Sequence, residues 1–301
     1  ENFKRIAEEG ISGEMLSEKY GGGTANIEFS VLTGYSNSFL PVGSVPYVEY
    51  INTDFLCYPQ FLKENGYQTL ALHPYKRTFY SRESTYSRMG FDAFVTQEAF
   101  TEDDIIGNYI GDQAAFAKAL ELYREAAQNG PVFLHIVTMQ NHVPNQPGEY
   151  PADYAVRAFI EGENEYSNAC LSSVATGLRD TDRAIGSFVD ALREETDDVV
   201  VLFFGDHQTD IKGEDGEDLL SHMASYNALS ADQKILRSHV TPYLMWANFD
   251  IKEQGIDGGL LPSYLLLPTM LHEYNVLRPA WMDWMYATKP ILGELSFDLY
   301  F

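Results

Sequence analysis

Runs of apolar residues alternate with helical patterns along the whole of this chain. The clearest run, from Val199 to Gly205, is typical of a strand buried on both faces, and an acid and a histidine follow it directly. Further strands are predicted at 11–20, 67–72, 131–139 and 240–247, and helices at 1–9, 25–32, 55–65, 109–127, 163–194 and within 261–277. This alternation predicts an α/β fold with a mostly parallel central sheet and helices on both faces.

A chain of 301 residues with 45% hydrophobic residues can form one large core. We find no linker, internal repeat or low-complexity tract, so we expect a single domain over residues 1–301. The first residues are typical of mid-domain sequence, and we expect an upstream region to have been cut away. Cys57 and Cys170 lie in apolar or helical surroundings, where two buried free thiols are a better interpretation than a disulfide.

The formal net charge of −24 limits the partners to consider. Binding to nucleic acid requires a basic surface, so we expect no nucleic-acid partner. Acidity of this kind is typical of soluble, secreted or surface-displayed domains. No stretch reaches the roughly 18 uninterrupted apolar residues of a membrane span, and the first residues do not form a signal peptide.

Three of the seven histidines, His73, His142 and His207, follow predicted strands at the point where each strand ends. In sheets of this class, sites lie outside the carboxyl ends of the strands. Asp206 directly precedes His207, and a carboxylate beside an imidazole is a typical ligand pair for Mn²⁺ or Zn²⁺. The three histidines together predict a site at this edge of the sheet. Taken singly, Asp206 could cap a turn, His207 could be merely exposed, and His73 could be a half-buried, hydrogen-bonded histidine.

Three glycines at 21–23 precede Thr24 and the predicted helix at 25–32. Glycines let the backbone approach a bound group closely, and a helix N-terminus favours an anion there. Thr24 could serve simply as the N-cap of that helix. It is equally well placed to be a nucleophile whose alkoxide is stabilised by a metal and by helix N–H groups.

Tyr80 and Arg82 follow His73 within the next segment. An arginine there can bind a phosphate in a bidentate manner, and Tyr80 can flank a small polyol. The alternative for Arg82 is a surface ion pair with Glu83 or a nearby acid. Asp180 is predicted to lie on the solvated face of the long helix at 163–194.

Five motifs occur in the order that one known family shows. They are GGGTANIEFSVLTG (21–34), FLPVGSVPY (39–47), ALHPYKRTFYSR (71–82), TMQNHVP (138–144) and FFGDHQ (203–208). The set resembles the extracellular catalytic domain of lipoteichoic acid synthase-like phosphoglycerol transferases, in the sulfatase/alkaline phosphatase superfamily. The resemblance spans nearly the whole chain and weakens after about residue 250.

The resemblance implies a metal site and a nucleophile. Thr24 matches the family's threonine nucleophile, which also binds the metal, and Asp206 and His207 match the Asp-His metal ligands. The family metal is usually Mn²⁺, with Mg²⁺ or Zn²⁺ as alternatives. The remaining family ligand is a glutamate at the end of the first sheet strand. We expect that strand to be absent from this chain, because Glu1 lies in a helical stretch too close to Thr24 to match it.

The resemblance also implies a substrate and a reaction. His73, Tyr80 and Arg82 match the substrate-binding His, aromatic residue and Arg, and His142 matches a histidine that contacts the phosphoglycerol group and serves in proton transfer. The implied reaction passes a phosphoglycerol headgroup from phosphatidylglycerol to a glycerophosphate polymer, through a threonine-linked intermediate. Family members act on the extracellular face of a bacterial cell membrane, anchored by upstream helices.

Three alternatives remain from the sequence. The first is a transferase of another phospho-headgroup, such as phosphoethanolamine. The second is a phosphodiesterase or sulfatase-type hydrolase, although the Cys/Ser-x-Pro-x-Arg signature of sulfatases is absent, since Ala-Asn-Ile follows Thr24. The third is a degenerate, non-catalytic domain that binds envelope polyanions.

Overall fold

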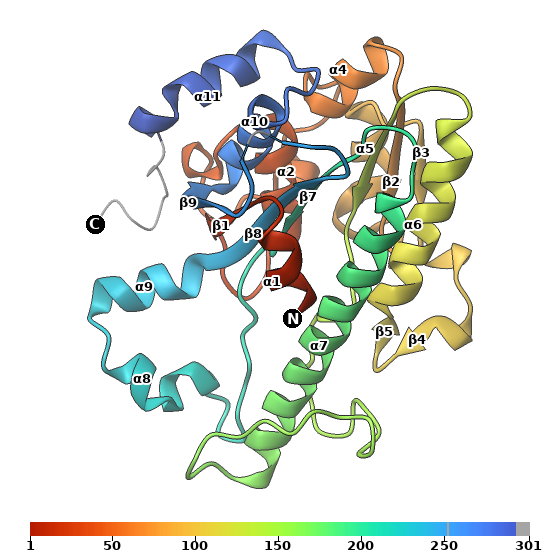
Figure 1. Ribbon diagram of the computed structural model, residues 1–301. Coiled ribbons are helices and arrows are strands. Elements are labelled where there is room, and N and C mark those ends of the chain that lie inside the picture. Colours follow the sequence, from red (N-terminus) through yellow and green to blue (C-terminus); the bar gives the residue numbers. More distant parts are fainter. Residues whose placement is uncertain (252, 293–301) are drawn as a thin grey trace.

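The computed structural model describes residues 1–251 and 253–292, so the end of the expected domain at 293–301 lies outside the described residues. Figure 1 shows two sheets covered by helices. The strands are β1 (Ile11–Leu16), β2 (Gln68–Leu72), β3 (Ala93–Val95), β4 (Ile105–Ile106), β5 (Tyr109–Ile110), β6 (Val132–Ile136), β7 (Val200–Phe204), β8 (Val240–Ala247) and β9 (Ile256–Pro262). The helices are α1 (Asn2–Ala7), α2 (Thr24–Thr33), α3 (Pro46–Glu49), α4 (Tyr58–Glu64), α5 (Arg82–Arg88), α6 (Asp112–Ala127), α7 (Glu165–Arg193), α8 (Ala224–Asn227), α9 (Ala231–His239), α10 (Ser263–Glu273) and α11 (Ala280–Leu292).

The strands form two larger sheets and one small hairpin. The first sheet has the order β3-β2-β6, with both pairs parallel. The second has the order β7-β8-β1-β9, in which β8 runs opposite to the other three strands. Strands β4 and β5 pair as an antiparallel hairpin. The predicted α/β fold class is confirmed.

Helices cover both faces of the second sheet, and β8 shows why. Tyr243 and Met245 pack with α2, α4 and α10 in one buried cluster, while Leu244 and Trp246 pack with α6 and α7 in another. Because successive side chains of a strand point to opposite faces, the apolar run from Tyr243 to Trp246 needs helices packed on both faces of the sheet. Figure 1 shows α6 and α7 side by side on one of these faces.

The two sheets are separated by a gap. Strands β6 and β7 are the facing edges, and they pair with β2 and β8 respectively rather than with each other. A cavity of about 1480 Å³ is lined by residues of both strands and by the helices on either side. The cavity separates β6 and β7, the facing edges of the two sheets. Because of it, all residues of β7 are only partly buried, although their side chains pack alternately against the buried clusters on the two faces, as predicted.

The structure also tests predictions for individual residues. Cys57 and Cys170 are buried and free, as predicted. Asp180 is only 8% exposed, because it accepts hydrogen bonds from Gln140 and Tyr154; its predicted place on a solvated face is wrong. The helix predicted from residue 109 starts at Asp112, since 109–110 form a strand.

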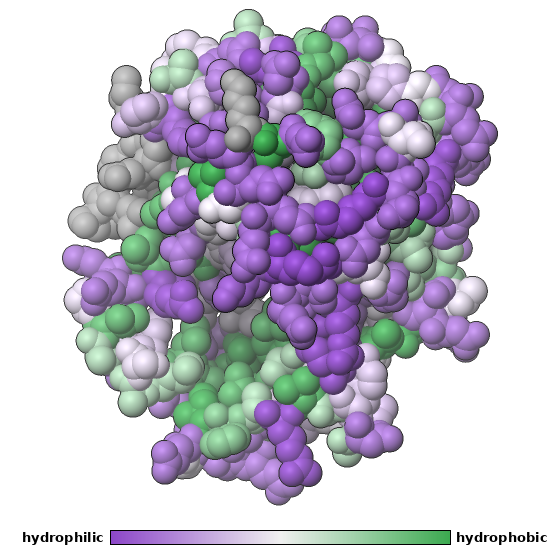
Figure 2. Space-filling view, viewed as in Figure 1, coloured by the Kyte–Doolittle hydropathy of each residue, from purple (hydrophilic) through white to green (hydrophobic). Residues whose placement is uncertain are grey.

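The surface of the molecule is largely polar in the view of Figure 2. Figure 2 shows a face that is mostly hydrophilic, with apolar residues mainly in the hollow between α8 and α7 and beside it. No helix within the described residues combines the length and the apolar character that a bilayer crossing requires.

Candidate active site

Thr24 lies at the start of α2, directly after the glycine run. Gly21, Gly22 and Gly23 have φ values of 65°, 154° and 95°, a region that residues with a side chain rarely adopt. Gly23 is the N-cap, so Thr24 is the first helical residue and its side chain makes no capping bond. The N-cap interpretation of Thr24 is therefore wrong. Its hydroxyl donates to Oδ2 of Asp206 instead, at 2.6 Å.

Two hydrogen bonds between loops bring these residues together. The loop after β1 donates from the Gly21 amide to the carbonyl of Gln208 at 3.1 Å. The Ser17 hydroxyl donates to the Asp206 carbonyl at 2.6 Å. The loops after β1 and β7 are thus joined at the carboxyl ends of their strands, where Asp206 and His207 were predicted to lie.

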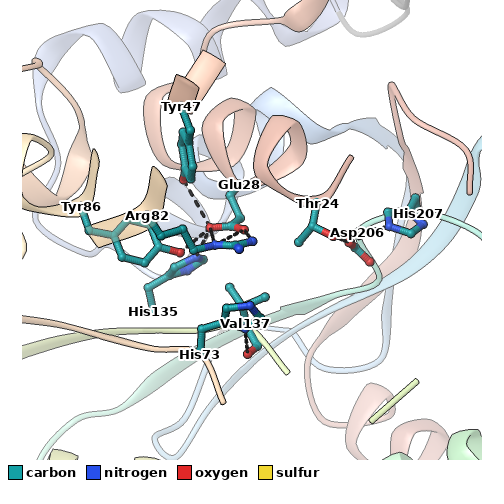
Figure 3. Close-up of polar contacts among 10 residues, drawn as sticks. All are labelled: Thr24, Glu28, Tyr47, His73, Arg82, Tyr86, His135, Val137, Asp206 and His207. Carbon is teal, nitrogen blue, oxygen red and sulfur yellow. Dashed lines mark hydrogen bonds and ion pairs between the residues drawn. The ribbon is translucent and has the colours of Figure 1, made fainter. Parts of the chain in front are cut away.

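His207 completes the group around Thr24. Its Nε2 lies 3.1 Å from Oδ2 of Asp206 and 3.4 Å from Oγ1 of Thr24. Its Nδ1 lies 2.9 Å from the carbonyl oxygen of Gln208, which can only accept, so the proton belongs on Nδ1 and Nε2 faces the group. Figure 3 shows the three side chains directed toward one another.

These three donors fit a divalent cation. Two oxygens and one nitrogen lie 2.6, 3.1 and 3.4 Å from one another. Ligands bound at roughly 2.1 Å to one ion sit about 3 Å apart. A His whose other ring nitrogen donates to a carbonyl is the usual metal-binding arrangement. Among residues 1–251 and 253–292 no group of three or more His, Cys, Asp or Glu side chains could hold a metal, so the set consists of two such residues and a threonine hydroxyl.

His73 lies at the end of β2 and is buried. Its Nδ1 is 3.0 Å from the carbonyl oxygen of Val137, while its Nε2 is buried without a partner. Burial, with the positive charge of Arg82 added, lowers the pKa of His73 to about 4, so the ring is neutral at physiological pH. The proton sits on Nδ1, which leaves Nε2 as an unused acceptor. His73 and Thr24 both line the same cavity.

Arg82 begins α5 and is 1% exposed. Its Nε and Nη2 both bind the carboxylate of Glu28, and Nη1 is buried without a partner. The predicted alternative, a surface ion pair with Glu83, is wrong, because Arg82 is turned into the molecule. Tyr80, next to it, has a φ of 54° and places its ring 5.2 Å from the Arg82 guanidinium carbon.

Glu28 is the residue that the sequence analysis missed. It lies four residues after Thr24 on α2, so the two share one face of the helix. An acid among the mostly uncharged and apolar residues from Ala25 to Leu32 was the available signal.

His142 lies beyond the end of β6 and is exposed. Its Nδ1 is 2.7 Å from the Val143 carbonyl oxygen, and the hydroxyl of Tyr109 donates to that same oxygen at 2.7 Å. His142 lines the same cavity as Thr24, His73 and Arg82. Its hydrogen-bond contacts are with Val143 and Tyr109, so it stands apart from the Thr24 group.

Relatives of this chain come from bacteria. A putative cyclic beta-1,2-glucan modification protein of Rhizobium meliloti is 29% identical over 290 residues, covering 94% of this chain and 42% of the relative. The lipoteichoic acid synthase of Staphylococcus saprophyticus is 27% identical over 270 residues, covering 85% of this chain and 38% of the relative. The chain thus spans less than half the length of these relatives.

Solved structures show the same fold. The phosphoglycerol transferase GacH of Streptococcus pyogenes, in complex with sn-glycerol-1-phosphate, matches with a TM-score of 0.78 at 23% identity, over 96% of this chain and 72% of that one. The lipoteichoic acid synthase LtaP of Listeria monocytogenes matches with a TM-score of 0.70 at 19% identity, over 92% of this chain and 66% of that one. The sulfatase family model matches residues 1–275, and the chain therefore belongs to the sulfatase family.

Proposed function

We propose that this chain is the catalytic domain of a metal-dependent phosphoglycerol transferase, with Thr24 as its nucleophile. The observation that carries the proposal is the 2.6 Å hydrogen bond from Thr24 to Asp206, with His207 beside it and Arg82 and His73 at the same cavity. The relatives and the fold support it: a lipoteichoic acid synthase is among the former, and a phosphoglycerol transferase among the solved structures.

Thr24, Asp206 and His207 would hold the cation, with Mn²⁺ expected and Mg²⁺ or Zn²⁺ as alternatives. Sulfatase-family enzymes are in general metal-dependent. When bound, such an ion lowers the pKa of a ligated hydroxyl and neutralises charge on a phosphate oxygen. The resemblance adds a glutamate ligand at the end of the family's first sheet strand.

The other residues of the site orient Thr24 and bind the substrate. Asp206 already accepts the hydrogen bond of the Thr24 hydroxyl, and Thr24 lines the cavity. Nη1 of Arg82 donates to a phosphate oxygen, and Nε2 of His73, an acceptor, receives a hydrogen bond from a glycerol hydroxyl. Tyr80 flanks the glycerol group at the rim.

The first transfer step forms the bond from Thr24 Oγ1 to phosphorus and breaks the bond from phosphorus to the diacylglycerol oxygen. The departing oxygen takes a proton and leaves as diacylglycerol. In the second step an acceptor hydroxyl attacks the phosphothreonine ester and restores the Thr24 hydroxyl. His142 has Nε2 free, because Nδ1 donates to Val143, so it can carry the proton between these groups.

The donor in this proposal is a phosphatidylglycerol-like headgroup, and the acceptor is a glycerophosphate polymer. The site would work on the extracellular face of a bacterial cell membrane, to which upstream helices would anchor the protein. A second acceptor class, a glucan, is favoured by the relative that is named for glucan modification. Three aromatic rings lie together beside the cavity: the Phe79 centroid is 5.4 Å from that of Tyr75 and 4.4 Å from that of Tyr80. Such rings offer apolar surfaces on which a sugar ring can pack.

The test is an assay of the native protein with Mn²⁺ and phosphatidylglycerol labelled in the glycerol headgroup. Parallel reactions contain a glycerophosphate oligomer, a cyclic β-glucan or water alone, and a further set replaces the lipid with phosphatidylethanolamine. We expect label to pass from phosphatidylglycerol to one of the two acceptors. Release to water at the same rate with or without acceptor would instead make the protein a phosphodiesterase, and transfer from phosphatidylethanolamine alone would make it a phosphoethanolamine transferase. No metal-dependent release from either lipid would support the non-catalytic alternative.

A further inference from the structure

The carboxylate of Glu28 is the centre of a buried polar cluster beside the candidate site. Nε and Nη2 of Arg82 and the hydroxyl of Tyr86 donate to it, and the Tyr47 hydroxyl and His135 Nε2 each lie 3.4 Å away. These partners come from α5, α3 and β6, and Glu28 itself from α2. Figure 3 shows them converging on this carboxylate, with Thr24 next to the cluster.

The cluster keeps both charges of the Glu28–Arg82 pair. Burial favours the neutral form of the Glu28 carboxyl, but Arg82 and His135 outweigh burial and hold its pKa well below its usual value. Burial raises the pKa of Tyr86, so this hydroxyl stays protonated and can donate. A buried ion pair of this kind costs desolvation of both ions, so folding stability alone does not account for it.

The pairing leaves one part of Arg82 unused. A guanidinium has five N–H donors in a fixed plane, and Glu28 takes the edge formed by Nε and Nη2. Nη1 is buried and without a partner, in a side chain that is 1% exposed and lines the cavity with Thr24 and His73. Because the guanidinium is planar and held at two atoms, Glu28 sets the direction in which Nη1 points.

The same helix carries the nucleophile. Thr24 and Glu28 are one turn apart on α2, which corresponds to a rise of roughly 6 Å along the axis. Because α2 is rigid, it fixes the distance between Thr24 and Glu28. Through Glu28 it also fixes the distance between the Thr24 hydroxyl and Nη1 of Arg82.

We propose that Glu28 is a positioning residue: it orients Arg82 so that Nη1 binds the phosphate of a glycerol phosphate group in front of Thr24. The proposal rests on the proposed function for the identity of that group. Glu28 itself does not contact the substrate, so all of its effect on binding must pass through Arg82.

The test is a double-mutant cycle on binding of sn-glycerol-1-phosphate, measured by calorimetry on the native protein with Mn²⁺. Glu28→Gln keeps the shape of the side chain but removes the charge that holds the guanidinium. We expect it to weaken binding about tenfold or more, the range for loss of a hydrogen bond to a charged group. In an Arg82→Gln background the same change should have no further effect, because Glu28 acts only through Arg82.

The matched control is Asp180→Asn, which removes another buried carboxylate that is paired with an arginine, at 2.8 Å from Arg179 Nη2. It should change glycerol phosphate binding less than twofold, whatever it does to the free energy of unfolding. If Glu28→Gln does not fold, Glu28→Asp keeps the charge and shortens the side chain by one methylene, and the same cycle applies, with loss of binding expected only when Arg82 is present.

Binding by a folded Glu28→Gln variant at the wild-type level would overturn the positioning role. So would additive losses in the cycle, or binding that does not depend on Arg82. Headgroup release is measured separately, so the two proposals fail separately. Arg82-dependent binding without release contradicts the transferase and leaves Glu28 in its role, whereas release with an additive cycle does the reverse.

Discussion

The hydroxyl of Thr24 and the carboxylate of Asp206 are joined by a 2.6 Å hydrogen bond, although the two residues are 182 positions apart. One stands at the start of α2 and the other after the end of β7. The carboxyl ends of strands on either side of β8 meet there, because β1 and β7 run in the same direction. The proposed nucleophile and the acid that it contacts are therefore placed by the sheet rather than by a local motif.

Thr24→Ala should abolish release of the labelled phosphatidylglycerol headgroup, with a loss of about a thousandfold or more, as for other catalytic nucleophiles. Thr24→Ser keeps the hydroxyl and should retain measurable release. Thr53→Ala, in an exposed loop, controls for loss of a threonine elsewhere. Wild-type turnover in the Thr24→Ala protein would remove this residue from the mechanism.

Asp206→Asn should weaken Mn²⁺ binding in calorimetry by about tenfold or more, because a neutral amide replaces a charged ligand. Asp232→Asn lies on the exposed face of α9 and should leave Mn²⁺ binding unchanged. Chelation should stop headgroup release, and added Mn²⁺ should restore it. Equal Mn²⁺ affinity in both variants would contradict the assigned ligand.

His73 should make folding stability depend on pH. Burial and the charge of Arg82 lower its pKa from 6.5 to about 4 in the folded protein. Between these values the unfolded chain binds more protons, so the free energy of unfolding falls as the pH falls, by about 2 kcal/mol from this residue between pH 7 and pH 5. Urea unfolding of the wild type and His73→Asn over this range should show a shallower dependence in the variant. Parallel curves would mean that His73 is protonated equally in both states.

Because of the gap between the sheets, a Leu→Ala substitution should lower the free energy of unfolding by different amounts at two positions. Leu266 is fully buried in α10, while Leu202 of β7 is only partly buried and lines the cavity. Leu266→Ala should cost about 2–5 kcal/mol through lost contacts and a new void, and Leu202→Ala clearly less, because space already exists beside it. Urea midpoints give both values. Equal losses would show that Leu202 is packed in solution.

Several features could be predicted from the sequence. Runs of contiguous apolar residues predict β2, β6, β7 and β8. The positions of the histidines at strand ends follow from where those runs stop. Thr24 could be placed between a glycine run and a helix, but only the structure showed that its hydroxyl bonds to Asp206 instead of capping the helix. These predictions need only the pattern of apolar and polar residues within one segment, which indicates its secondary structure and which residues share a face.

Contacts between distant segments decided the rest. Arg82 pairs with Glu28 in the interior rather than with its neighbour Glu83, and Asp180 is covered by a loop rather than by water. The half-buried state of β7 depends on what lies beside its edge, which the composition of the strand does not record. Patterns along the chain thus sufficed to place groups of the candidate site at the ends of helices and strands. The tertiary structure alone decided which of those groups meet, because burial and pairing depend on segments brought together only by folding.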